Sequence, residues 1–584
     1  MEIHYTDEKN TLILISLLKS HNIKRIIVSP GSTNIRFAMS VQNDKFFEVY
    51  SAPDERSAAY MACGLAAETN EPVVISCTGA TASRNYVPGL TEAFYRKLPV
   101  LAVTSTQHIG RVGHHVAQVI DRSVQMKDLV KLSIDVPTIH DLDDEWSCVT
   151  NVNKAILELT KDGGGPVHIN LATTYSMDFT TKELPKYRVI NRYTYGDTLP
   201  EMPKGRIGIF VGSHSVWNKE LIDTVEKFCK KYNSVVFVDQ TSGYKGKYHA
   251  MVSLLCAQKK YRPDCVHLDL MINIGEITGS YHSLSTKEVW RISPDGEVKD
   301  SYKCLTKVFE MNEEDFFKTY LLKEYNSSIK KSFIDEWNKE TENIYNKIPE
   351  NLPFSNPWVA KVTAPKIPKD AVVHLGILSS LRSWNFFETD PTVHCYSNVG
   401  GFGIDGGLSS LIGASLANKN KLYFGVFGDL AFFYDMNVLG NRHVGNNVRI
   451  ILINNGKGTE FRNYNHLGAG FGDDADVLIA AGGHYGNKSN KLVKHYAEDL
   501  GYEYYAASTK EEYMAVLDKI INPKLSDKSI IVEVFTNNVD ESNSLKVIDN
   551  LETDSRGAIK QAAKKVLGQK GIAAAKKIKN SLRK

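Results

Sequence analysis

Short apolar runs rich in β-branched residues recur along the whole chain and alternate with stretches of helical periodicity. Runs this apolar, with helices between them, indicate parallel strands that are buried on both faces of a sheet. We therefore predict the α/β class, with three doubly wound parallel sheets. The runs form three sets: 25–29, 72–77, 99–104 and 166–171; then 206–211, 234–239, 270–274 and 289–292; then 371–375, 421–427, 448–453 and 529–535.

Loop-like stretches separate the three sets of runs. One lies near residues 180–203, and another, with three prolines, lies near 345–357. They predict a first domain at 1–185, a central domain at 186–350, a third domain at 351–550 and a tail at 551–584. The first and third domains could share one architecture.

The formal net charge of +3 hides an asymmetry at the C-terminus. Residues 555–584 hold ten Lys/Arg and no acid, whereas the other residues hold 60 Lys/Arg and 67 Asp/Glu. The body therefore has no nucleic-acid signature. The tail alternates apolar stripes with lysines, which predicts contact with an anionic membrane surface or with a partner in an assembly. A solvated terminal helix is the alternative.

Two motifs with polar ligand atoms directly follow strands of the third set. Gly428-Asp429-Leu430 follows one predicted strand, and Asn454-Asn455-Gly456-Lys457 follows another. Glycines let backbone N–H groups approach a phosphate, and carboxylate and amide oxygens suit Mg²⁺ or Ca²⁺. Because parallel strands end at one edge of their sheet, we expect a ligand site there.

This pattern resembles the diphosphate and metal motif of thiamine diphosphate-dependent enzymes. The resemblance covers about residues 5–550 and implies the fold type of that family, in the order pyrimidine-binding, central and diphosphate-binding domain. It implies thiamine diphosphate and Mg²⁺ as cofactors, with the metal held by Asp429, Asn455 and the carbonyl of Lys457. Gly428 and Leu430 would lie beside the diphosphate.

A second signature of the same family lies in the first domain, where the sequence DERSAAY at 54–60 precedes an apolar helix. In the family a glutamate at this point contacts the N1′ nitrogen of the aminopyrimidine. A carboxyl placed there can share its proton with that nitrogen. The resemblance therefore implies that Glu55 is catalytic. It implies further cofactor contacts by Thr78, Asn85, Phe402 and Ile404, the last as the bulky residue beneath the bent cofactor.

Other stretches resemble one branch of the family, the synthase of menaquinone biosynthesis, which decarboxylates 2-oxoglutarate and adds the fragment to isochorismate. They are SPGS at 29–32, QVID at 118–121, GIDGGLSS at 403–410 and GDLAFFYDMNVLG at 428–440. That branch carries arginines where this chain has Thr33, Val399 and the loop at 105–108. Since arginines clamp carboxylates, their loss argues against that pair of substrates.

Several residues remain as candidates for contact with substrate. Two histidines in the loop before Gln118 resemble the pair that shuttles protons in pyruvate decarboxylase, and imidazole suits that role. Gln118 lies where related synthases place a substrate-orienting glutamine. The candidate catalytic residues besides Glu55 are thus His114, His115 and Gln118, and the candidate substrate residues are Ser32, Arg84, Arg382 and Arg462.

The resemblance implies an enzyme that decarboxylates a 2-oxo acid and transfers the acyl carbanion to an acceptor. Three alternatives stay open: simple decarboxylation to an aldehyde, transketolase-like ketol transfer, and a cofactor-binding scaffold without chemistry. In the family, Glu55 and Asp429 would come from different subunits, so we expect a homodimer or homotetramer. Acidic residues at the N-terminus and cysteines without CxxC spacing predict a cytoplasmic protein. The basic tail leaves open a peripheral place at the inner membrane face.

Overall fold

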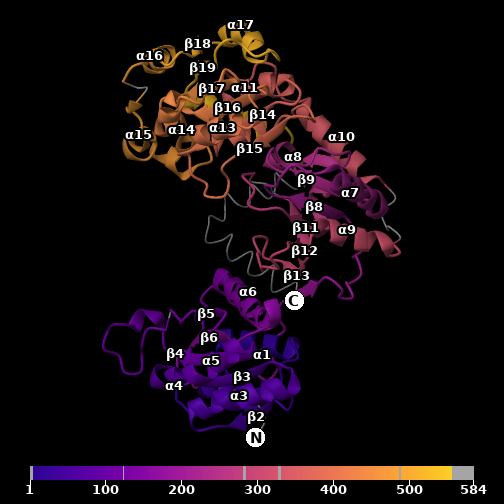
Figure 1. Ribbon diagram of the computed structural model, residues 1–584, viewed down its shortest axis with the longest axis vertical. Coiled ribbons are helices and arrows are strands. Elements are labelled where there is room, and N and C mark those ends of the chain that lie inside the picture. Colours follow the sequence, from indigo (N-terminus) through magenta and orange to yellow (C-terminus); the bar gives the residue numbers. More distant parts are fainter. Residues whose placement is uncertain (1–3, 123, 281–283, 326–330, 486–487, 555–584) are drawn as a thin grey trace. The chain divides into compact units, whose positions relative to one another are not determined.

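The computed structural model describes residues 4–122, 124–280, 284–325, 331–485 and 488–554 (Figure 1). The described chain divides into two compact units. One comprises the residues up to Leu199 together with Val289–Met311, and the other comprises the remaining described residues. Every strand predicted from an apolar run is present, and all the paired strands whose register is defined are parallel.

The first sheet has the strand order β2-β1-β3-β4-β6-β5. Consecutive residues of its strands enter two different apolar clusters. Ile26 of β1 packs with α1 and α6, whereas Ile27 packs with α3 and α5. Helices therefore cover both faces, as predicted for a doubly wound sheet. The elements are β1 (Arg25–Val28), β2 (Glu48–Ser51), β3 (Val73–Thr78), β4 (Val100–Thr106), β5 (Leu132–Val136), β6 (Val167–Ala172), α1 (Lys9–Ser20), α2 (Ile35–Gln42), α3 (Glu55–Thr69), α4 (Ala80–Asn85), α5 (Val87–Tyr95) and α6 (Leu142–Glu158).

The second sheet has the order β10-β9-β8-β11-β12-β13-β7. Aromatic side chains from its helices and strands pack edge to face, for example Phe237 against Trp337 and Phe228 against Phe317. Its elements include β7 (Asn191–Thr194), β8 (Ile207–Val211), β9 (Val235–Val238), β10 (His249–Met251), β11 (His267–Ile274), β12 (Ser285–Ile292), β13 (Leu305–Glu310), α7 (Lys219–Tyr232), α8 (Ser253–Ala257), α9 (Glu313–Leu322) and α10 (Phe333–Tyr345).

The third sheet has the order β15-β14-β16-β17-β19-β18, which repeats the order of the first sheet strand for strand. The shared architecture expected for the first and third domains is therefore confirmed, as is the α/β class. The elements are β14 (Val372–Leu375), β15 (His394–Tyr396), β16 (Tyr423–Gly428), β17 (Val448–Asn454), β18 (Glu503–Ala507), β19 (Ile530–Phe535), α11 (Asn356–Thr363), α12 (Ser379–Trp384), α13 (Gly407–Ser415), α14 (Asp429–Asp435), α15 (Asp474–Leu478), α16 (Leu492–Asp499), α17 (Lys510–Ile520) and α18 (Asn538–Ile548).

The domain boundaries at 185, 350 and 550 stay predictions. The basic tail, residues 555–584, lies outside the described residues. Within the described part of the chain, no helix combines the length and the apolar character that crossing a membrane requires.

Candidate active site

Asp429 lies at the junction where β16 ends and α14 begins, and its side chain accepts hydrogen bonds from α14 and from the loop after β17. Its Oδ1 accepts a hydrogen bond from the Leu430 N–H at 2.8 Å, and its Oδ2 accepts one from the Gly456 N–H at 2.8 Å. Only 5% of the residue is exposed. Burial raises the pKa of Asp429 to about 7, which the two backbone donors oppose only in part. A buried carboxylate of this kind favours a nearby cation.

The two asparagines at the end of β17 make different contacts. Asn454 Nδ2 donates to Glu533 Oε1 at 2.6 Å and so joins β17 to β19. Asn455 Nδ2 donates to Thr459 Oγ1 at 3.3 Å, while its Oδ1 is buried and has no hydrogen-bond partner. A buried amide oxygen without a donor is costly unless a ligand completes it.

The strands that precede Asp429 and Asn455 are neighbours in the sheet, with Gly428 opposite Ile453 in the register. A buried carboxylate and an orphaned amide oxygen therefore lie at the same sheet edge, as the sequence predicts. This donor set fits a hard divalent cation. Among the described residues there is no cluster of three His, Cys, Asp or Glu side chains that could hold a metal. The Lys457 side chain turns to Asp476, with Nζ to Oδ2 at 2.6 Å, so only its carbonyl is available to the predicted site.

Ile404 and Phe402 lie in the glycine-rich loop before α13. Ile404 lines a small hollow with Gly376, Gly407 and Phe427, at the ends of β14 and β16. Phe402 has a φ of 57°, a conformation that is unusual for a residue with a side chain. The loop is thus held in a specific shape beside the edge that carries Asp429.

Glu55 is the first residue of α3, in the other compact unit. Asp54 caps the helix, since its Oδ1 accepts from the Ser57 N–H at 2.7 Å. Glu55 Oε2 accepts from Asn85 Nδ2 at 3.2 Å, so the fold brings these two predicted residues together. Glu55 is half-buried rather than buried in the single chain.

Thr78 ends β3, and its hydroxyl contacts the hydroxyl of Thr33. Thr33 is buried and donates to the Ser105 carbonyl at 2.9 Å. The position at which the menaquinone branch carries an arginine is therefore an internal hydrogen-bond link in this chain. Ser32, its neighbour, is exposed, and its carbonyl accepts from Arg36 Nη1 at 3.0 Å.

The loop that carries His114, His115 and Gln118 is exposed. His115 and Gln118 have φ values of 55° and 64°, in the left-handed region that side chains rarely adopt. Backbone strain of this kind often accompanies functional loops. The structure brings neither histidine to Glu55 through any hydrogen bond among the described contacts.

The three arginines proposed as substrate ligands all contact protein acceptors. Arg382 on α12 forms a bidentate ion pair with Glu460, with Nη1 to Oε2 at 2.6 Å and Nη2 to Oε1 at 2.8 Å. Arg462 pairs with Asp476 at 2.5 Å and with Asp473 at 3.1 Å. Arg84 Nη2 donates to the Asp121 carbonyl at 2.9 Å.

Glu460, the partner of Arg382, was not predicted from the sequence. It lies 78 positions from Arg382 in the chain, and no local pattern links the two. The one sequence feature that could have indicated Glu460 is its place after Asn455, in a segment where polar residues follow the end of a strand.

The chain is similar to several known proteins. A family model described as the N-terminal TPP binding domain of thiamine pyrophosphate enzymes matches residues 10–126. A 2-succinyl-5-enolpyruvyl-6-hydroxy-3-cyclohexene-1-carboxylate synthase from Bacteroides fragilis is 30% identical over 581 residues, which cover 93% of this chain and 98% of that protein. The synthase of the same name from Bacteroides thetaiotaomicron is 30% identical over 564 residues, with the same coverage.

Other known proteins are less similar to the chain. The synthase of that name from Porphyromonas gingivalis is 25% identical and covers 94% of this chain and 97% of its own length. Among solved structures, the thiamine diphosphate-dependent 4-hydroxybenzoylformate decarboxylase of Rhodococcus jostii RHA1 aligns over 90% of this chain and 99% of its own. Its TM-score is 0.37 and its sequence identity is 15%.

Proposed function

The chain belongs to the thiamine diphosphate-dependent family of 2-succinyl-5-enolpyruvyl-6-hydroxy-3-cyclohexene-1-carboxylate synthases, and we propose how its own residues serve that chemistry. Membership makes the protein a thiamine diphosphate-dependent decarboxylating carboligase. The cofactor, when bound, supplies the electron sink for the electrons left when carbon dioxide departs. We assign to this chain the tasks of holding the cofactor, exchanging a proton with it and choosing the substrates.

We propose that Asp429, Asn455 and the Lys457 carbonyl would hold Mg²⁺, whose positive charge would favour binding of the diphosphate. The observation that supports this best is the unpartnered, buried Asn455 Oδ1 beside the buried Asp429 carboxylate. Mg²⁺ prefers oxygen ligands and keeps several positions for water and phosphate, and three protein oxygens leave room for these. Gly428 has open space where a Cβ would lie, so the backbone there can approach a phosphate oxygen.

We propose that Glu55 exchanges a proton with N1′ of the aminopyrimidine, and that Asn85 orients it through the 3.2 Å hydrogen bond. Thr78 would contact the same ring, and Phe402 and Ile404 would support the bend of the cofactor. The exposed loop with His114, His115 and Gln118 would close over bound substrate, where imidazole could move a proton.

We propose a homodimer, or a dimer of dimers, in which a second copy of the chain covers Glu55. Two observations support this partner. Glu55 is half-buried in the single chain, and Tyr60 and Met61 on α3 are about half exposed. In the other unit, Leu467, Phe471 and Leu478 are largely exposed near the segment that follows Asn455. Apolar surfaces of this kind mark protein interfaces.

The donor is proposed to be a 2-oxo acid and the acceptor a compound with a carbonyl or an alkene. The test is carbon dioxide release from a panel of 2-oxo acids by the protein with thiamine diphosphate and Mg²⁺, with and without acceptors. We expect release that depends on both cofactors, and a ligated product when the acceptor is present. Free aldehyde as the sole product would favour the simple decarboxylase. No release from any 2-oxo acid would contradict the proposal.

The basic tail supports a separate proposal, peripheral contact of a cytoplasmic protein with an anionic membrane. Each Lys or Arg near such a surface contributes about 1 kcal/mol. Deleting residues 555–584 should abolish salt-sensitive binding to phosphatidylserine vesicles in a flotation assay and leave turnover intact. Full-length protein that ignores these vesicles at low salt would contradict the membrane contact.

A further inference from the structure

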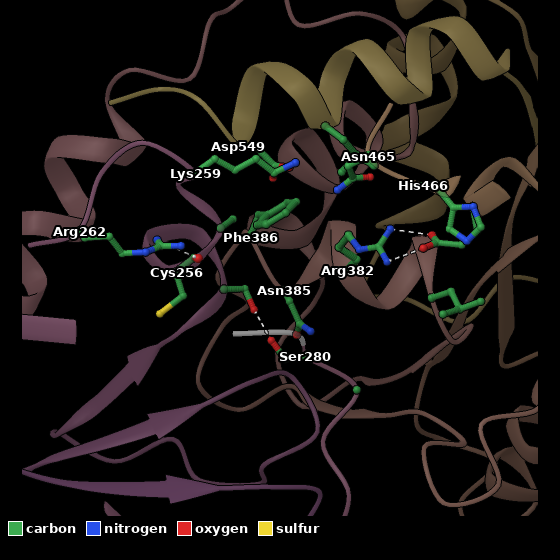
Figure 2. A pocket seen from close by; sticks show the side chains of 16 residues that line it. Cys256, Lys259, Arg262, Ser280, Arg382, Asn385, Phe386, Asn465, His466 and Asp549 are labelled. Carbon is green, nitrogen blue, oxygen red and sulfur yellow. Dashed lines mark hydrogen bonds and ion pairs between the residues drawn. The ribbon is translucent and has the colours of Figure 1, made fainter. Parts of the chain in front are cut away.

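A cavity of about 430 Å³ lies within the second compact unit, between the segment that begins with α8 and the segments α12, Thr459–Arg462 and the end of α18 (Figure 2). Its volume suits a small organic molecule. One edge of it adjoins the segment after β17, because Asn455 Nδ2 donates to Thr459 Oγ1 and Thr459 precedes the lining residue Glu460 in one short helix.

The basic side chains that line this cavity are bonded to the protein itself. Figure 2 shows dashed lines from both terminal nitrogens of Arg382, which mark its bidentate pair with Glu460. Lys259 Nζ lies 3.2 Å from Asp549 Oδ2 and contacts the Tyr464 hydroxyl. Arg262 Nη1 donates to backbone carbonyls, including those of Cys256 and Tyr261.

Glu460 accepts a hydrogen bond from a second side chain besides Arg382. Its Oε2 also accepts from Asn463 Nδ2 at 3.2 Å, and only 20% of its side chain is exposed, against 26% for Arg382. A bidentate arginine–carboxylate pair is geometrically specific and strong. A carboxylate that entered the cavity would have to compete with Glu460 for the same guanidinium edge, and like charges at this distance repel.

Neutral hydrogen-bonding groups also line the cavity, beside apolar residues such as Leu378 and Phe386. Asn385 is 1% exposed, and its Nδ2 has no hydrogen-bond partner, although its Oδ1 accepts from the Gln240 N–H at 2.9 Å. The hydroxyls of Ser253 and Ser280 pair at 2.7 Å. His466 Nδ1 accepts from the Gly468 N–H at 3.0 Å, which leaves Nε2 to carry the proton of the neutral ring.

We propose that this cavity binds an uncharged hydrogen-bonding group of a substrate rather than a carboxylate, and that Glu460 determines this preference by pairing with Arg382. The buried Asn385 amide would donate to that group. The inference rests on the proposed function only in calling the ligand a substrate. Binding itself can be measured without turnover.

Succinamide and succinate are matched probes, since they have the same shape and differ in charge. Binding of each to the full-length protein loaded with thiamine diphosphate and Mg²⁺ would be measured by isothermal titration calorimetry. We expect the wild-type protein to bind succinamide more tightly than succinate. Glu460→Gln removes the competing charge and keeps the side-chain shape, and a charge-assisted pair with Arg382 should then raise succinate affinity by about tenfold or more.

The double variant Glu460→Gln, Arg382→Gln is the matched control, and it should lose the succinate gain. The proposal is overturned if wild type prefers succinate, if wild type binds neither probe, or if Glu460→Gln gains succinate affinity that survives removal of Arg382. If Glu460→Gln does not fold, the wild-type comparison of the two probes still decides. Thiamine diphosphate affinity, measured on the same samples, reports separately on the proposed function.

Discussion

The first and third sheets share one strand order but present different chemistry at the same edge. In the first, β3 ends in Thr78, whose hydroxyl contacts Thr33, and the ionisable residue Glu55 comes from a helix start. In the third, β16 leads directly into Asp429, and β17 leads into Asn455. One doubly wound topology thus offers a common platform, and the residues after each strand decide which ligand group it receives.

The two edges also differ in how complete they are within one chain. Asp429 is buried and held by two backbone N–H groups, so the edge proposed to bind the cation is preformed. Glu55 is half-buried and has one side-chain donor, Asn85. The third-sheet edge is therefore formed within one chain, whereas the first-sheet edge leaves Glu55 partly open to solvent. Substitutions at the two edges should accordingly fail in different ways.

The largest effect is expected at the preformed edge. Asp429→Ala should remove Mg²⁺-dependent binding of thiamine diphosphate, because it deletes the only carboxylate assigned to the cation. Changes to residues that merely orient metal ligands cost 10–100-fold, so this loss should exceed about 100-fold in the dissociation constant. Calorimetric titration with the cofactor and Mg²⁺ measures it.

The neighbouring asparagines provide the control for that experiment. Asn455→Ala should also weaken Mg²⁺-dependent binding, whereas Asn454→Ala, which breaks the bond to Glu533, should lower stability and keep the Mg²⁺ dependence. An unchanged cofactor affinity in Asp429→Ala, or equal effects of the two asparagine variants, would refute the assigned ligands.

The next largest effect is expected at the first-sheet edge, in turnover rather than in binding. Glu55→Gln should leave thiamine diphosphate bound and slow turnover by about 10²–10⁴-fold, the usual contribution of a positioned acid or base. Steady-state carbon dioxide release and cofactor titration separate the two quantities. Asp54→Asn, which keeps a capping side chain, should retain activity. A rate for Glu55→Gln within threefold of wild type would sink the assignment.

A third prediction joins the two edges. If each site takes Glu55 from one subunit and Asp429 from its partner, mixing the inactive Glu55→Gln and Asp429→Ala proteins should restore activity. In each mixed dimer one site carries both changes and the other carries neither. After complete exchange about a quarter of wild-type activity should return. Mass spectrometry would confirm that the subunits have exchanged. Mixtures that then stay inactive would show that Glu55 and Asp429 of one site come from the same chain, or that the two residues do not share a site.

The sequence located the central strands of each sheet because these are continuous apolar runs. It missed mainly edge strands, such as β2, whose residues are largely exposed, and β15, which has three residues. An edge strand pairs on one side only, so polar residues are tolerated and the apolar signal weakens.

The candidate site follows the same logic. Asp429 and Asn455 could be placed at one sheet edge because they directly follow apolar strands, whereas Glu55 was singled out only through the resemblance of DERSAAY to a family motif. Their roles stay predictions. The pair of Arg382 with Glu460 could not be predicted, since it depends on how α12 meets the segment after β17. Likewise, sequence could note that Thr33 replaces an arginine, but only the fold shows the hydroxyl bonded inside the protein.

The smallest expected effect compares one buried histidine from each sheet. On β6, His168 has both ring nitrogens bonded to hydroxyls, with Thr104 at 2.7 Å and Ser133 at 2.8 Å. On β14, His374 has a buried Nε2 without a partner. Burial, with the charges of Arg122 and Arg84, lowers the pKa of His168 to about 3, and burial alone lowers the pKa of His374 to about 4.

At pH 7, His168→Leu should lower the free energy of unfolding by about 1–3 kcal/mol, because it leaves two hydroxyls without their partner. His374→Leu breaks no such hydrogen bond at Nε2, so it should change the free energy of unfolding by less than about 0.5 kcal/mol. Below pH 6.5 the unfolded chain binds a proton that each folded histidine excludes, so acidification costs the wild type about 1.4 kcal/mol per pH unit and per histidine until the folded pKa is reached. At pH 5 the His374→Leu protein should therefore melt above wild type, although the two melt together at pH 7. Differential scanning calorimetry at both pH values measures the melting temperatures. A His374→Leu variant that melts well below wild type at pH 7 would contradict the prediction, because the ring would then have a stabilising partner that the single chain does not supply.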